Sequence, residues 1–182
     1  MARLSPRARK LALTAHVCSS VGWLGAIAAF LAVALSGLAA HDGEVVRASY
    51  VAMNWIGWYP LVPISFASLL TGLIQSLGTE WGLFRHYWVL AKLLINLLAN
   101  VVLLLYMLEL SSLVAMLSNH EASGFRSISP VLHSTVALGL LLVATVLAVY
   151  KPRGITPYGW RKQQERRRKA WRQRQDVALS ES

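Results

Sequence analysis

Four long runs of apolar residues, separated by short polar segments, are the main feature of this chain. They cover residues 11–38, 50–77, 87–110 and 128–150. Each run reaches the ~20 residues that a helix needs to cross a hydrocarbon core of ~30 Å. A soluble helix of this length would carry a polar face, and these runs largely lack one. The pattern therefore predicts an all-α fold, a four-helix transmembrane bundle.

The polar segments divide the 182 residues into three parts. Residues 1–10 form a basic N-terminus, residues 11–150 the membrane bundle and residues 151–182 a basic tail. Because the connections between the runs are short, consecutive helices are expected to be antiparallel neighbours. The second run contains Pro60 and Pro63, which predict a kink near residues 59–64. Such a proline is either a tolerated feature of a membrane helix or the wall of a cavity.

Basic residues are concentrated at the two ends of the chain. Of the 18 Lys and Arg residues, four lie in residues 1–10 and ten in residues 151–182. By the positive-inside rule both termini are cytoplasmic, which agrees with an even number of spans. The loops around residues 41–47 and 119–126 are then expected outside, and the loop around residues 78–85 inside.

The first apolar run has one alternative interpretation, a cleaved signal peptide ending near Ala39-Ala40. The run is much longer than the ~7–15 apolar residues of a signal peptide, so a retained span is favoured. The chain has one cysteine, Cys18, within this run. It has no partner for an intramolecular disulfide, and we expect it to pack as a small apolar residue.

The tail has a strongly basic segment, with eight Lys or Arg and one Glu in residues 161–174. Next to a membrane helix, each such charge contributes ~1 kcal/mol to the binding of anionic lipid headgroups. Nucleic acid is an alternative partner on charge alone, but tethering at the bilayer favours lipid. Trp160 and Trp171 are expected to anchor a helix at the membrane surface.

Ionisable residues inside the apolar runs are unfavourable in lipid and are therefore candidates for function. His16 lies near the cytoplasmic end of the first run, and Trp23 follows seven residues later on nearly the same helix face. Lys92, Asn96 and Asn100 form a polar stripe on the third run. His16 is alternatively a histidine that hydrogen-bonds across the bundle. Lys92 alternatively extends its long side chain to the inner interface.

Two further ionisable residues, Glu109 and His133, lie toward the outer side. Imidazole is a good ligand for Zn, Cu and Fe, so His41, His120 and His133 are a conceivable outward metal site. No close spacing of ligands supports that site.

The first and third runs carry motifs that resemble a known family. His16, Trp23 and Gly25 match the His-x6-Trp-x-Gly pattern of the first helix of HemJ-type protoporphyrinogen oxidases, and Trp88-Val-Leu-Ala-Lys92-Leu resembles their Trp-x3-Lys-Leu pattern. CopD-type copper-resistance membrane domains have similar patterns. Over nearly its whole length the chain also resembles uncharacterised actinobacterial four-helix membrane proteins, through Gly-Trp-Leu-Gly and Arg-His-Tyr-Trp-Val-Leu-Ala-Lys. This likeness implies a bacterial plasma membrane and no known activity.

The HemJ-type resemblance implies a small bundle that binds haem b. Carried over by position, His16 is the candidate axial ligand and Lys92 the candidate catalytic residue. Trp23 and Asn96 are then expected to line the cofactor pocket near the cytoplasmic side, with Arg85 near the propionates and His86 as a second candidate ligand. The family usually has another histidine late in its third helix, where this chain reads Leu-Leu-Leu-Tyr at residues 103–106.

A second class of function fits the same residues. In a non-enzymatic membrane module, such as an accessory subunit or a small-solute permease, the polar stripe would hold helices together or line a solute path. A second copy of the chain, in a homo-oligomer, or another membrane protein is a conceivable partner. A purified haem protein is red, whereas a structural module is colourless.

Overall fold

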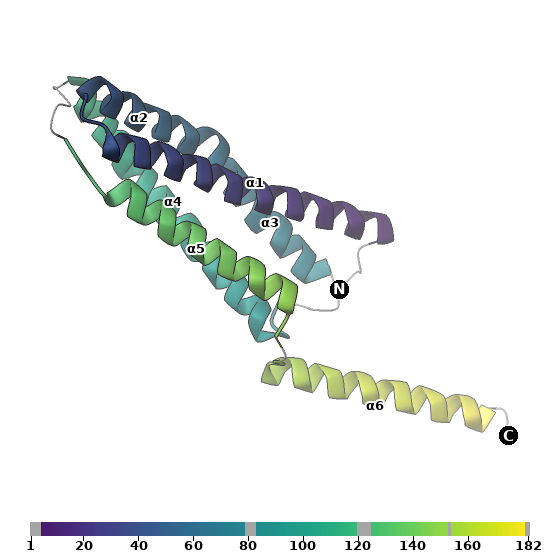
Figure 1. The fold of residues 1–182 in the computed structure, drawn as a ribbon. Helices are drawn as coiled ribbons and strands as arrows, with labels where there is room; N and C mark the ends of the chain where they lie inside the picture. The colour runs from purple at the N-terminus through teal and green to yellow at the C-terminus, as the bar shows by residue number, and fades with distance from the viewer. Residues whose placement is uncertain (1–4, 79–82, 120–124, 153, 181–182) are drawn as a thin grey trace.

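The computed structural model describes residues 5–78, 83–119, 125–152 and 154–180, which are almost entirely helical. The helices are α1 (Pro6–Ala39), α2 (Gly43–Ile56), α3 (Val62–Gly78), α4 (Tyr87–Asn119), α5 (Ser129–Tyr150) and α6 (Pro157–Ser180) (Figure 1). A π-helical turn at Gly57–Leu61 joins α2 to α3, so that these two helices form one span. Four helices are long and apolar enough to cross a membrane, as the sequence predicts.

Three of the observed spans extend beyond the apolar runs. The first begins at Pro6 rather than at residue 11, so it includes part of the basic N-terminus. The second begins at Gly43 rather than at residue 50, because the side chain of Asp42 accepts a hydrogen bond from the Glu44 amide and caps the helix. Arg47, expected in a loop, is therefore on α2. The third span continues past residue 110 to Asn119. Ser111 and Ser112 follow that point, and their hydroxyls donate to carbonyls of the preceding turn instead of ending the helix.

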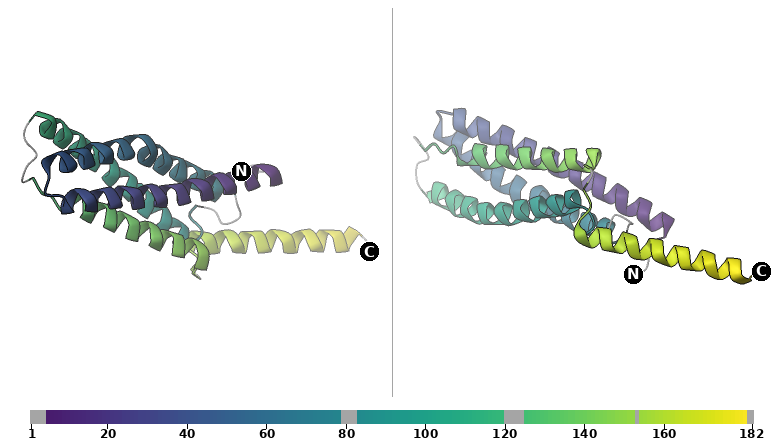
Figure 2. Two further views of the ribbon diagram at one scale, coloured as in Figure 1. Left: turned by 45° about the horizontal axis from the view of Figure 1, so that its top comes forward. Right: turned by 90° about the horizontal axis from the view of Figure 1, so that it is seen from below.

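The four spans form an elongated bundle in which α1 occupies a central position. It packs against α2 and α3 on one side and against α5 on the other, while α4 contacts α2, α3 and α5 (Figures 1 and 2). Trp23, Ile27 and Phe30 of α1 meet Met53 of α2 and Met107 of α4 in the buried core. The beginning of α1 and the end of α5 lie at the same end of the bundle (Figure 1).

The outer surface of the bundle is also apolar. Side chains such as Leu70, Leu105, Val143 and Val149 point away from the other helices and are exposed. In water this surface would be strongly unfavourable, whereas in a bilayer it faces acyl chains. The chain is therefore an integral membrane protein that crosses the membrane several times. Cys18 is exposed on this outer surface. The expectation that it packs as a small apolar residue against other side chains is therefore not met.

The predicted kink corresponds to the π-helical turn. Pro60 has no backbone N–H, and the amide of Val62 reaches back five residues to the carbonyl of Gly57. The helix bends at this turn (Figure 2). Gly57 faces Met107 so closely that a Cβ atom there would overlap the methionine side chain. The bend thus brings the second span directly onto α4.

The tail contains a further helix, α6, that is attached to the bundle by its first turn. The Thr156 amide donates to the carbonyl of Arg85 (2.9 Å), and its hydroxyl donates to the carbonyl of Phe84 and accepts from the Gly159 amide (3.1 Å). A Cβ atom at Gly159 would lie 2.5 Å from the Arg85 carbonyl oxygen, so this contact requires glycine. Beyond the first turn α6 is exposed and extends past the end of the bundle (Figures 1 and 2).

Substitution of two glycines, one at the contact of α1 with α2 and one away from it, tests how closely these helices pack. A Cβ atom at Gly37 would lie 2.9 Å from the Cβ of Ser49, whereas Gly139 has no atom within 4 Å of that position. We expect Gly37→Leu to destabilise the protein by about 1–3 kcal/mol, because the two helices must separate. Gly139→Leu is the matched control and should have little effect. Unfolding of both variants in detergent, followed by circular dichroism, measures this. Equal stability would contradict the close packing.

Candidate functional site

A polar cluster joins α1 to α3 in the half of the bundle that contains the start of α1. His16 and Ser20 on α1 face Ser68 and Thr71 on α3. The hydroxyls of Ser20 and Ser68 are 3.0 Å apart. Spacings of three and four residues on both helices place these side chains on facing surfaces. Each is buried or half-buried.

The hydrogen bonds of His16 fix the position of its proton. Its Nδ1 atom lies 3.1 Å from the carbonyl oxygen of Ser68 and 3.1 Å from Oγ1 of Thr71. The Thr71 hydroxyl donates to the carbonyl of Ala67 (2.6 Å), so it accepts from the imidazole, and a carbonyl can only accept. Nδ1 therefore carries the proton. In the neutral ring, Nε2 then holds a free lone pair.

The imidazole of His16 lies against α3 at a glycine. A Cβ atom at Gly72 would be 3.0 Å from Cε1 of the ring. A larger residue at position 72 would therefore displace the imidazole. Nε2, by contrast, has no hydrogen-bond partner among the described residues. Hydrogen bonds at Nδ1 therefore hold the His16 ring in place, while Nε2 remains available to a ligand.

The polar stripe on α4 faces the bundle. Lys92 is half-buried and close enough to His16 for its charge to act on the imidazole. Asn96 donates to the carbonyl of Lys92, and Asn100 donates to that of Asn96, each over 2.8 Å. Asn100 is only 3% exposed and also accepts from the hydroxyl of Ser65 on α3 (2.8 Å). His16 on α1 and Lys92 on α4 thus lie in the same half of the bundle, with Asn96 one turn further along α4.

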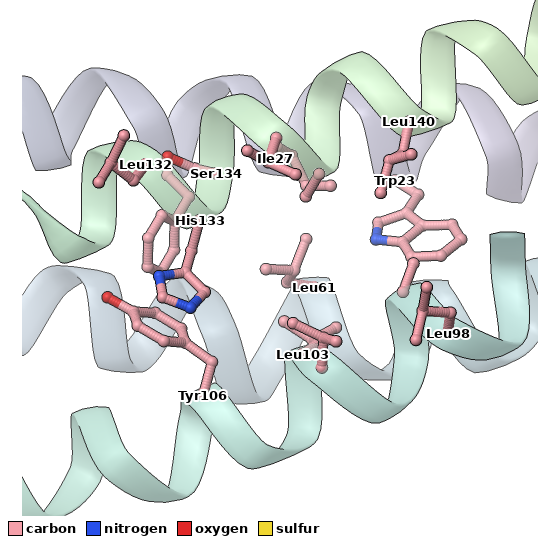
Figure 3. A pocket seen from close by; sticks show the side chains of 15 residues that line it. Trp23, Ile27, Leu61, Leu98, Leu103, Tyr106, Leu132, His133, Ser134 and Leu140 are labelled. Carbon is pink, nitrogen blue, oxygen red and sulfur yellow. The ribbon is translucent and has the colours of Figure 1, made fainter.

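Trp23 lies two turns along α1 from His16, in different surroundings. It is 2% exposed and lines an apolar cavity of about 400 Å³ between α1, α4 and α5 (Figure 3). His16 and Lys92 do not line this cavity. The indole Nε1 of Trp23 is buried and has no hydrogen-bond partner among the described residues.

The cavity ends at a stacked pair that the sequence did not predict. The rings of Tyr106 and His133 lie 4.4 Å apart, nearly parallel at 21° (Figure 3). His133 also bonds through Nδ1 to the carbonyl of Ser129 (2.9 Å). The described residues contain no cluster of three or more metal-binding side chains. The outward metal site expected from His41, His120 and His133 stays a prediction, because His120 lies outside the described residues.

Arg85 and His86 lie at the beginning of α4, beside the first turn of α6. The Arg85 carbonyl accepts from Thr156, and His86 forms an isolated antiparallel bridge with Ile155. His86 precedes Lys92 by six residues, which is ~9 Å along the helix axis. These two residues therefore lie nearer the end of the bundle than His16 and Lys92.

No protein-family model matches the chain, and no curated protein or solved structure is similar enough to match it. The evidence for function is therefore the arrangement of its own residues in a small multi-pass membrane protein.

Proposed function

We propose that the protein binds haem b inside the membrane bundle, with His16 as the residue that would hold the iron, through Nε2. The observation that carries this proposal is the pair of hydrogen bonds at Nδ1 of His16, to Ser68 and Thr71. Histidines that bind metals usually donate their other ring N–H to a carbonyl or carboxylate, which fixes the tautomer and the ring orientation. His16 has this arrangement, and imidazole is a common ligand of haem iron. Haem bound here would supply one-electron redox chemistry.

Lys92 and Asn96 have supporting roles in this proposal. In this proposal the ammonium group of Lys92 pairs with a propionate, or holds a proton during catalysis, and Arg85 adds positive charge nearer the membrane surface. Asn96 already uses its amide N–H on the Lys92 carbonyl, which steadies this turn of α4. Trp23 and His86 are more distant from His16. Trp23 contributes to the apolar wall of the bundle, and His86 is a weaker second candidate for the iron.

One observation favours a second candidate, a membrane module without catalysis. Several buried or half-buried polar contacts join two helices: His16 to Ser68, Ser65 to Asn100, and the Trp58 indole to the Ser111 hydroxyl at 2.8 Å. Such bonds stabilise membrane bundles by ~0.6 kcal/mol on average, without any cofactor. In that case His16 is a structural residue.

An absorption spectrum separates the two candidates. We expect the protein, produced with added haem precursor and purified in detergent, to be red with a Soret band. His16→Ala should remove or strongly shift that band, because the iron loses its imidazole. Lys92→Met should keep much of the colour but retain haem less well.

Two histidines provide matched controls for this experiment. His41 and His133 are exposed, and neither contacts His16, so His41→Ala and His133→Ala should keep the wild-type spectrum. A colourless wild-type protein that folds normally would exclude haem and favour the module. A red His16→Ala variant with an unchanged Soret band would exclude His16 as the ligand.

We also propose that both termini are cytoplasmic. The support is the charge distribution, with four basic residues in residues 1–10 and ten after residue 150. The start of α1 and the end of α5 lie at one end of the bundle, as this orientation requires (Figure 1). Reporter fusions at Ser182 and at Gly43 should give opposite localisation signals. Signals from the same side would contradict the orientation.

A third proposal concerns the basic tail, for which we propose anionic lipid headgroups as the partner. Lys162, in the second turn of α6, is near enough to Arg85 for their charges to interact, which concentrates positive charge beside the end of the bundle. The adjacent Glu165 pairs with Lys162 (2.9 Å), raising the pKa of the lysine and lowering its own.

Charge reversal in this helix tests the lipid proposal. Arg166→Glu combined with Arg167→Glu lowers the net charge by four units, and should release a soluble fusion of residues 151–182 from vesicles that contain phosphatidylserine. Gln163→Ala with Gln164→Ala is the neutral control and should bind normally. Sedimentation with vesicles measures the bound fraction. If the unchanged fusion bound equally well to vesicles of neutral phosphatidylcholine, binding through anionic headgroups would be contradicted.

A further inference from the structure

The apolar cavity beside Trp23 opens toward the bilayer. Leu98 and Val102 of α4 and Leu132 and Val136 of α5 line it, and all four side chains are also exposed on the bundle surface. None of the lining residues is Asp, Glu, Lys or Arg. A molecule that enters between α4 and α5 therefore comes from the acyl-chain region and carries no net charge.

The unpartnered nitrogen of Trp23 indicates what this molecule must offer. Figure 3 shows the indole nitrogen directed toward the middle of the cavity. A buried N–H without an acceptor is unfavourable, and native structures rarely leave one. Water is a poor partner here, because a buried water usually needs two to four polar neighbours. Figure 3 shows aliphatic side chains near Trp23, among them Leu98 and Leu140. An acceptor oxygen on an otherwise apolar molecule satisfies the nitrogen.

The far end of the cavity indicates an elongated shape. Phe30 lies one heptad after Trp23 on α1, ~10 Å further along the axis. There its ring meets the edge of Tyr106, with centroids 6.4 Å apart, and Tyr106 stacks on His133. The space between the two ends is lined by aliphatic side chains (Figure 3).

We propose that this cavity binds an uncharged, lipid-soluble carbonyl compound that enters from the bilayer between α4 and α5. Its carbonyl oxygen accepts the hydrogen bond from Nε1 of Trp23, and its apolar body extends toward Phe30 and Tyr106. A volume of about 400 Å³ is within the range of small-molecule sites. The proposal does not depend on haem, because His16 is not part of the cavity wall.

Photolabelling with 4-octylbenzophenone tests this site, because the probe has a ketone, an apolar body and light-dependent reactivity with C–H bonds. In lipid nanodiscs we expect saturable labelling of the cavity walls, in residues 23–30, 98–106 and 132–140, mapped by peptide mass spectrometry. Trp23→Phe keeps an aromatic ring and removes the N–H, so the half-saturating concentration should rise about fivefold. His16→Ala should label as the wild type does.

A cavity-filling pair provides the control for steric effects. Ala137 lines the cavity, whereas Ala29 is exposed on the outer face of α1. Ala137→Phe should abolish saturable labelling, and Ala29→Phe should leave it unchanged. The proposal is overturned by labelling that does not saturate and spreads over outward residues such as Val17 and Val149. It is also overturned if Trp23→Phe, correctly folded by circular dichroism, binds the probe with wild-type affinity.

Discussion

The absence of water in the bilayer core is the constraint on which this structure depends. Backbone groups there must be paired inside the chain, which leaves helices as the only option for a chain of this composition. Polar side chains must also find partners within the bundle. Asn100, with Ser65 and the carbonyl of Asn96, shows a complete solution, because its amide both donates and accepts. Trp23 and Gln75 are exceptions, since the buried Nε1 of Trp23 and the buried Nε2 of Gln75 find no partner among the described residues.

Much of the fold could be predicted from the sequence, because the length of an apolar run is set directly by membrane thickness. The four spans and the irregular turn at Pro60 both follow from this kind of local signal. Helix ends could not be predicted as well, because they depend on short-range hydrogen bonds that hydropathy does not reveal. Asp42 caps α2, which begins at Gly43, seven residues before the expected start, and the serines after residue 110 bond to their own helix and let α4 continue.

The candidate site could be predicted only in part. Helical periodicity places His16 and Trp23 on one face of α1, and Lys92 at a similar depth on α4. Periodicity does not show which helix each residue meets. His16 bonds to α3, whereas two turns later Trp23 faces the cavity between α4 and α5. The stack of Tyr106 on His133 joins two helices, and although His133 stands out as an ionisable residue in an apolar run, nothing in the sequence pairs it with Tyr106. These contacts depend on how the helices pack against one another, which cannot be read directly from the sequence.

The attachment of α6 by its first turn has a mechanical consequence. The helix has 24 residues and is ~36 Å long, and beyond Gly159 its residues are largely exposed. It therefore acts as a lever whose short arm is the contact of Thr156 and Gly159 with Phe84 and Arg85. A small sideways force on the distal end produces a larger force at that contact. The force passes into the beginning of α4, which is the helix that carries Lys92.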